Sequence, residues 1–177
     1  MSLRHFAVAF AVLTSSQGSL AWKPEIGEIP GEITTYDYVD ESMLSLEALR
    51  GSPLVLYFGA DWCVPCQKAR PVVARVAKAY AEAGLKVVFL SSDDNRLRDA
   101  KKVEEGQLGL RVAMPKLSTC PVKSCPSGRA DLGPFGKIYR FPTAVLIDRA
   151  GVVTEKMESG DGVSTGLEPA VKLLLAR

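Results

Sequence analysis

Two uninterrupted apolar runs mark the middle of the chain. Residues 53–59 read PLVLYFG and residues 85–91 read LKVVFLS. Runs without alternating polar residues are typical of strands buried on both faces, as in a parallel sheet covered by helices. The segment between them ends at Gly84 and repeats apolar residues at helical spacing, namely Ala69, Val72, Val73, Val76, Ala77 and Tyr80. The pattern therefore predicts a strand, a helix and a second strand parallel to the first.

Weaker patterns predict further elements on both sides of this unit. Residues 32–39 (EITTYDYV) favour a short strand, and residues 44–51 (LSLEALRG) favour one helical turn. Residues 143–157 (TAVLIDRAGVVTEKM) predict two strands joined by a turn. The apolar spacing of residues 167–175 predicts a last amphipathic helix.

The region between these two halves is the least regular. Residues 95–106 are polar and predict a surface helix. Residues 107–135 hold several prolines and glycines, and they predict no defined element.

The N-terminal residues carry the three-part pattern of a secretory signal peptide. Arg4 precedes a short apolar run, FAVAFAVL, and small residues follow at Ser19 and Ala21. The run is too short to span a bilayer, which needs about 20 residues. We expect cleavage after Ala21, so that residues 1–21 are a signal peptide and residues 22–177 form one domain. The alternatives are an uncleaved membrane anchor or a frayed amphipathic segment.

Composition and charge exclude several classes of function. The 177 residues are 47% hydrophobic and 24% charged, as in one globular domain. His5 is the only histidine and lies in the predicted signal peptide, which excludes Ser–His and Cys–His catalysis in the mature chain. Loss of Arg4 lowers the net charge from +2 to +1, and no basic stripe remains to bind nucleic acid. We expect no nucleic-acid partner and, without a second long apolar run, no stable membrane span after processing.

The pair Cys63 and Cys66, in WCVPC, lies where the first buried strand gives way to the helix. A helix start offers unpaired N–H groups and the positive end of the dipole, and both favour a thiolate. We therefore expect Cys63 to be exposed and nucleophilic, and Cys66 to lie one turn further in and to resolve a mixed disulfide. Pro65 stiffens the bridge, and Trp62 can shield the site and offer a flat apolar contact.

Two other interpretations of this pair are weaker. A zinc site would need Cys120 and Cys125 as its other ligands, and these lie far beyond zinc-ribbon spacing. An inert structural disulfide across two residues would stabilise the chain little. We therefore expect a redox-active pair and no metal, in the oxidising compartment that export implies.

WCVPC, with Pro71 five residues after Cys66, resembles the thioredoxin superfamily. LSLEALRGSPLVLYFGADWCVPC and FPTAVLIDRAGVV are similar, more narrowly, to TlpA/ResA-like thiol–disulfide oxidoreductases, over about residues 44–92 and 138–177. The resemblance implies an α/β thioredoxin-like fold, with a central mixed β-sheet flanked by helices. It also implies an N-terminal β extension and an insertion at about residues 93–137, before the cis-proline strand.

The resemblance assigns Pro142 to the cis-proline that lies opposite the cysteine pair. A cis bond turns the chain sharply, and Phe141 before it can offer backbone groups to an extended substrate. The residues alone favour an ordinary trans proline at the start of a strand. The bulk of Phe141 implies a narrow range of partners.

Two acidic positions of the family hold other residues in this chain. Tyr57 stands where thioredoxins keep a buried acid, and Ala69 stands where ResA-like members keep a glutamate. A buried carboxylate would help to take the proton from the second thiol. The general base for Cys66 therefore stays open, because Asp61, the nearest acid in sequence, is more simply a solvated surface residue.

A second pair, Cys120 and Cys125, lies in a proline-bordered stretch, CPVKSC. Four cysteines allow three pairings, and local pairing leaves Cys63 and Cys66 together. We expect Cys120–Cys125 to be a structural disulfide that clips the insertion, worth about 2 kcal/mol. A second exchange site or electron relay is the alternative, although nothing visible activates either thiol.

The predicted activity is protein thiol–disulfide exchange without a bound cofactor. The resemblance implies a periplasmic enzyme that reduces client proteins carrying a cysteine pair, in cytochrome c maturation or copper-site assembly. It also implies a membrane thiol–disulfide carrier protein that recharges the enzyme.

Two alternatives to this function stay open. One is a disulfide-forming oxidase or isomerase, which differs in its reduction potential. The other is a non-enzymatic metal chaperone on the same fold, against which the lack of a mature histidine counts. A peroxidase is weaker still, because its threonine-to-cysteine motif is missing.

Overall fold

A computed structural model describes residues 24–37, 42–60, 62–91, 111–115, 130–131, 137–138 and 140–177. The predicted signal peptide and most of the predicted insertion, with its surface helix, lie outside these residues, as do Asp61, Cys120 and Cys125. Within the described ranges, no helix is long and apolar enough to cross a membrane.

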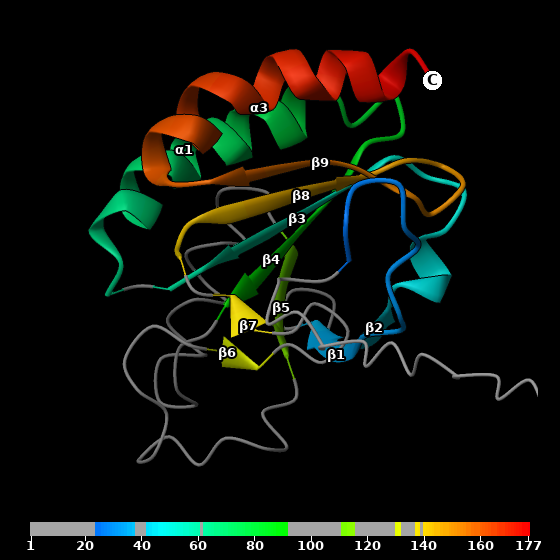
Figure 1. Cartoon of the computed structure of the whole chain (residues 1–177), viewed down its shortest axis with the longest axis horizontal. Helices are drawn as coiled ribbons and strands as arrows, with labels where there is room; N and C mark the ends of the chain where they lie inside the picture. Colours follow the sequence, from blue (N-terminus) through cyan, green and yellow to red (C-terminus); the bar gives the residue numbers. More distant parts are fainter. Residues whose placement is uncertain are drawn as a thin grey trace, which may run out of the picture.

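Seven strands form one mixed sheet within the described residues, which confirms the predicted α/β class (Figure 1). Their order across the sheet is β2, β1, β5, β4, β3, β8 and β9. β3 runs parallel to β4 as predicted, β4 runs parallel to β5, and the other neighbours are antiparallel. The strands are β1 Thr34–Asp37, β2 Ser42–Ser45, β3 Leu54–Gly59, β4 Lys86–Ser91, β5 Arg111–Pro115, β8 Thr143–Ile147 and β9 Val153–Glu158. A separate ladder pairs β6 Ala130–Asp131 with β7 Lys137–Ile138.

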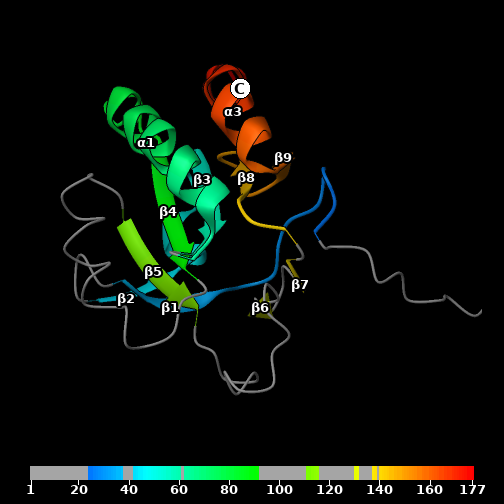
Figure 2. The same ribbon diagram turned by 90° about the vertical axis from the view of Figure 1, so that its left-hand side faces the viewer.

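The two α-helices of the described residues, α1 (Val64–Ala79) and α3 (Gly160–Leu175), cover the same face of this sheet (Figures 1 and 2). The core beneath them joins strand residues to helix residues, including Val55, Tyr57, Phe89, Leu146, Val73, Val76, Leu167 and Val171. A second core fills the opposite face, including Leu56, Phe58, Val88, Val145, Ile33, Leu44 and Leu49. Each large apolar side chain that is fully buried contributes about 1.5–3 kcal/mol to stability. The central strands therefore need apolar residues on both faces, which is why their sequences do not alternate.

α1 follows its predicted range more closely than α3 does. α1 continues through Pro71, and the chain turns at Gly84, whose φ of 87° suits a glycine. α3 begins at Gly160, earlier than the apolar spacing predicts. Its start is capped by Ser159 Oγ, which accepts a hydrogen bond from the Gly162 N–H at 3.3 Å. The first two turns of α3 contain several glycines, which have no side chain and so do not contribute to an apolar helical repeat.

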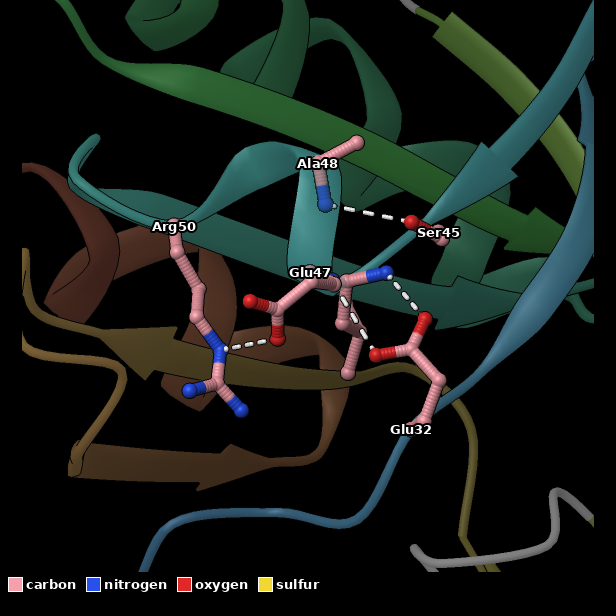
Figure 3. Close-up of polar contacts among 6 residues, drawn as sticks. Glu32, Ser45, Glu47, Ala48 and Arg50 are labelled. Atoms are coloured by element: carbon pink, nitrogen blue, oxygen red, sulfur yellow. Dashed lines mark hydrogen bonds and ion pairs between the residues drawn. The ribbon is translucent and has the colours of Figure 1, made fainter.

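Glu32 ties the segment before the sheet to the 3-10 helix η1 (Glu47–Leu49), as Figure 3 shows. Its carboxylate accepts hydrogen bonds from the backbone N–H of Leu46 at 2.9 Å and of Glu47 at 3.1 Å. Ser45 Oγ accepts a third, from the Ala48 N–H at 3.1 Å. These bonds satisfy N–H groups that a helical turn leaves without partners at its start.

The same N-terminal segment lies along one end of the edge strand β9. The Gly27 N–H donates to the Val153 carbonyl at 2.8 Å, and the Val153 N–H donates to the Glu28 carbonyl at 2.9 Å. Edge strands expose backbone groups that can pair with another chain. The segment therefore pairs with both backbone groups of Val153, the first residue of β9, on the side of the strand that faces away from β8.

Candidate active site

Cys63 and Cys66 form a disulfide at the N-terminal tip of α1. Cys63 is the N-cap residue of the helix, and its sulfur accepts a hydrogen bond from the Cys66 N–H at 3.2 Å. The Cα atoms of the two cysteines are 5.2 Å apart. On reduction, the same N–H and the helix dipole would face the thiolate of Cys63.

The predicted exposure of Cys63 is wrong for this oxidised pair. Only 5% of Cys63 is exposed, and Cys66 is fully buried. Phe141 packs against a small cluster formed by Ala60 and the two cysteines. Two large apolar side chains next to the pair are exposed, Trp62 at 56% and Val64 at 58%.

The loop opposite the disulfide carries the cis-proline. The Phe141–Pro142 peptide bond is cis, as the resemblance implies. β8 follows directly and pairs with β3 so that Thr143 lies opposite Phe58, which brings the loop to the end of β3 where the cysteines begin. Two hydrogen bonds hold the loop, from Thr143 Oγ1 to the Arg140 carbonyl at 2.7 Å and from the Ser159 N–H to the Pro142 carbonyl at 3.0 Å.

Aromatic rings form the surface between the two segments. The centroids of Trp62 and Phe141 lie 5.9 Å apart in an edge-to-face arrangement, which is a favourable geometry for aromatic pairs. The structure thus brings together the predicted residues Trp62, Cys63, Cys66 and Phe141.

The start of α3 presses against Pro65. A Cβ on Gly160 would lie 2.9 Å from Pro65 Cβ and 3.3 Å from its carbonyl oxygen, so only glycine fits without a shift. Ser159 before it has a φ of 87°, a conformation that non-glycine residues rarely adopt. The Ser–Gly corner therefore touches both halves of the site, the cysteine turn through Pro65 and the cis-proline loop through Pro142.

Tyr57 lies beneath the disulfide in the place of the family's acid. It is fully buried, and its hydroxyl donates a hydrogen bond to the Cys66 carbonyl at 3.0 Å. A phenol that donates its proton in this way is a poor proton acceptor near neutrality, since its ordinary pKa is about 10. Tyr57 supports the first turn of α1 rather than supplying the missing base.

Sequence reasoning did not single out Gly59, Arg70, Ser159 or Gly160. A Cβ on Gly59 would lie 3.1 Å from Phe89 Cε2 and 3.4 Å from Cys66 Sγ, so its lack of a side chain lets the sulfur approach the strand. The dipeptide at 159–160 is a turn signal in the sequence. Arg70 gives no such signal, because arginine is normally expected on the surface.

No group of three or more metal-ligating side chains occurs in the part of the chain that the structure describes. Cys120 and Cys125 lie outside it, so their pairing stays a prediction.

Comparisons with known proteins agree with this geometry. Residues 51–153 match a family model described as Thioredoxin-like. Over 136 residues, the chain is 29% identical to a thiol-disulfide oxidoreductase ResA of Bacillus cereus, and the match covers 76% of this chain and 70% of ResA.

Two solved structures share the fold at low sequence identity. One is the thioredoxin domain of a thiol-disulfide oxidoreductase from Bacteroides vulgatus, with a TM-score of 0.62, 21% identity, and coverage of 84% of this chain and 99% of that one. The other is a thiol:disulfide interchange protein from Chlorobium tepidum TLS, with a TM-score of 0.59, 21% identity, and coverage of 86% and 99%. The comparisons confirm the predicted fold and the resemblance to TlpA/ResA-like proteins.

Proposed function

The chain belongs to the thioredoxin-like family, and from that premise we propose that it is a thiol–disulfide oxidoreductase acting on client proteins through Cys63 and Cys66. The observation that carries the proposal is the disulfide at the tip of α1, opposite a cis-proline. Its relatives named thiol-disulfide oxidoreductases support the same class of reaction.

The reductive reaction proceeds in two exchange steps. The Cys63 thiolate attacks one sulfur of a client disulfide, so that a Cys63–client bond forms, the client disulfide breaks, and one client thiolate leaves. The Cys66 thiolate then attacks Cys63, so that the Cys63–Cys66 bond forms and the second client sulfur leaves. The client gains two electrons and two protons, and the cysteine pair of the enzyme is oxidised.

The client approaches over the aromatic surface beside the disulfide. Trp62 and Val64 are exposed there, and Phe141 packs against the cluster that contains the buried Cys63. Since the covering side chain must move before Cys63 can attack, Phe141 selects clients that can displace it. Its backbone groups, next to Pro142, are available in the proposal to pair with an extended client segment.

The finer assignments follow the family resemblance. The protein acts as a reductant in the periplasm after loss of residues 1–21. Its clients carry a cysteine pair, as in cytochrome c maturation or copper-site assembly, and a membrane thiol–disulfide carrier restores its dithiol form. The site needs no cofactor, because electrons enter and leave through sulfur.

Covalent trapping in the native host tests the exchange reaction. Cys66→Ser keeps the attacking sulfur of Cys63 and removes the resolving one, so mixed disulfides with clients should accumulate. These adducts should disappear on addition of a thiol reductant, as judged by non-reducing electrophoresis. The matched control Cys63→Ser/Cys66→Ser should form none. A Cys66→Ser chain that captures no client, while remaining folded, would contradict the proposed function.

A further inference from the structure

Ser159 has a backbone conformation that is unusual for a residue with a side chain. Its φ is 87° and its ψ is 152°. This region of the backbone map is occupied almost only by glycine, and another residue persists there only when its surroundings offset the strain. Such outliers concentrate at functional sites. Ser159 lies at the candidate site, between the end of β9 and the start of α3.

The contacts of Ser159 with α3 fix its ψ but not its φ. Its Oγ accepts a hydrogen bond from the Gly162 N–H at 3.3 Å, and its carbonyl accepts one from the Val163 N–H at 3.1 Å. The ψ is ordinary for an N-cap residue, whereas the φ of such a residue is normally negative. A half-turn of the Glu158–Ser159 peptide would bring φ into that normal range and keep both contacts. The strain is therefore stored in the orientation of one peptide group.

This peptide group holds the cis-proline loop. The Ser159 N–H donates to the Pro142 carbonyl at 3.0 Å, next to the ladder pair of Thr143 and Glu158. Residues paired at such a position of an antiparallel ladder normally exchange two hydrogen bonds, but proline has no N–H to donate. At this position of the ladder, one hydrogen bond from a strained residue therefore ties Pro142 to the corner.

The same half-turn would release the loop. Because the peptide is planar and trans, its N–H and the Glu158 carbonyl point in opposite directions. After the half-turn, the Glu158 carbonyl would face the Pro142 carbonyl, and two acceptors cannot share a hydrogen bond. Phe141 precedes Pro142 and packs against the cluster that contains Cys63, which is only 5% exposed. A loop that moves away from the corner would carry Phe141 away from this cluster.

The contact between Gly160 and Pro65 keeps the cysteine turn in place during this change. A Cβ on Gly160 would lie 2.9 Å from Pro65 Cβ, so the two backbones are in close contact. Rotation of one peptide group changes the ψ before it and the φ after it, and it leaves the flanking Cα atoms almost where they were. The half-turn thus moves the cis-proline loop relative to the cysteine turn.

We propose that Ser159 is a strained latch on the cis-proline loop, whose release moves Phe141 and opens Cys63 of the oxidised protein to an incoming thiol. The latch is the hydrogen bond from the Ser159 N–H to the Pro142 carbonyl. Ser159 is a positioning residue, because it exchanges no atom with the thiol. Its strain raises the free energy of the closed state and so increases the population of the open state. The inference rests on the proposed exchange function, in which a carrier thiol must reach the oxidised pair.

The experiment measures how fast excess dithiothreitol reduces the Cys63–Cys66 disulfide. One thiolate of the reagent attacks Cys63, so that a bond to Cys63 forms, the Cys63–Cys66 bond breaks, and Cys66 leaves and takes up a proton. The second thiol of the reagent then displaces Cys63, which also gains a proton, and the reagent closes into its cyclic disulfide. Two electrons pass to the protein. Timed alkylation and peptide mass spectrometry follow this pair separately from Cys120 and Cys125.

Ser159→Gly keeps the backbone N–H and removes the strain of the closed state, so the open state becomes rarer. Reduction should slow about tenfold, which corresponds to a strain in the middle of the usual range for such a conformation. Ser159→Ala is the matched control. It loses the same hydroxyl but keeps the Cβ, and hence the strain, so its rate should stay within about twofold of that of the natural chain.

Urea separates release of a local latch from general unfolding. A peptide rotation and a loop movement expose little surface, so the reduction rate of the natural chain should change little with urea below the unfolding transition. Urea unfolding should also show Ser159→Gly to be more stable than Ser159→Ala, because both lose the cap and only glycine relieves the strain. A reduction rate that rises steeply with urea would show that the thiol enters through global unfolding, and it would overturn the inference.

Equal rates for Ser159→Gly and the natural chain would also overturn it. So would a Ser159→Ala chain that slows as much as Ser159→Gly, since the hydroxyl would then be responsible. A Ser159→Gly chain less stable than Ser159→Ala would show that Ser159 carries no strain. Failure of the proposed function looks different, because dithiothreitol is not a client. In that case Cys66→Ser would trap no client, while the difference between the glycine and alanine variants would persist.

Discussion

At the residue scale, the site features that could be predicted depend on partners nearby in the sequence, and those that could not depend on partners far along the chain. The spacing of Cys63 and Cys66 after an apolar run was enough to place the pair at a helix start, because those partners are local. The burial of Cys63 was not predictable, since its cover, Phe141, comes from a distant segment. Arg70 was missed for the same reason, because its ring partner, Phe89, lies on β4 rather than in the same helix.

Gly160 allows a sharp test at this scale. Gly160→Ala should lower the free energy of unfolding of the oxidised protein by about 1–3 kcal/mol, because its methyl group would overlap Pro65 at 2.9 Å. Urea unfolding measures the change.

Gly166→Ala is the matched control within the same helix. A Cβ there would meet only the side chain of Met157, at an ordinary 3.4 Å from its sulfur. Relief of glycine's entropy cost should raise stability by about 0.5–1 kcal/mol. Equal effects of the two substitutions would show that the close approach to Pro65 is unimportant.

Among the secondary-structure elements, the central ones were the most predictable. β3 and β4 follow continuous apolar runs that only a doubly covered strand explains, and β8 and β9 follow a clear strand–turn–strand pattern. The start of α3 was missed, because glycines and a side-chain cap replace apolar residues there. Capping is a geometric property that hydrophobic spacing does not report.

The contact between α1 and α3 predicts a pH dependence of stability. Glu168 of α3 accepts hydrogen bonds from Arg75 Nη1 at 2.7 Å and from the Tyr80 hydroxyl at 3.1 Å. Arg75 lies in α1, and Tyr80 is the C-cap residue of that helix. The Arg75 hydrogen bond, followed by that of Tyr80, lowers the pKa of Glu168 below its ordinary 4.5. The folded chain therefore holds the carboxylate form more strongly than the unfolded chain does.

A lowered pKa contributes stability that is present above pH 4.5 and is lost as the pH falls through the folded value. The stability difference between the natural chain and Glu168→Gln should thus shrink on acidification from about pH 6 to about pH 3. Chemical unfolding at each pH measures it. A difference that grows toward acid pH would contradict the assignment.

For the whole molecule, the sheet order assembles the site from three separate segments. β3 delivers the cysteines, β8 follows the cis-proline loop, and the turn after β9 supplies the Ser–Gly corner. Local patterns predicted β1, β3, β4, β8 and β9, but they predicted neither β2 and β5 nor the order of the strands across the sheet. Pro142 therefore entered the predicted site only through the family resemblance, and Gly160 did not enter it.

The proposed reducing direction predicts a reduction potential for the Cys63–Cys66 pair near −270 mV, about that of thioredoxin, rather than near −120 mV, about that of a strong oxidant. Burial of both cysteines favours this value, because a buried site disfavours the thiolate, whose ionisation would otherwise stabilise the reduced pair. Equilibration with glutathione buffers and quantification of free thiols measures the potential. A measured potential near −120 mV would contradict the proposed reducing direction.

The aromatic cover on Cys63 has a consequence for biosynthesis. A ribosome completes β3 and the first turn of α1 long before it reaches position 141, so the newly made dithiol emerges with nothing above it. Until the segment that contains position 141 folds back, the sulfurs are open to any oxidant or other thiol nearby. The pair is therefore shielded only after most of the polypeptide has been made.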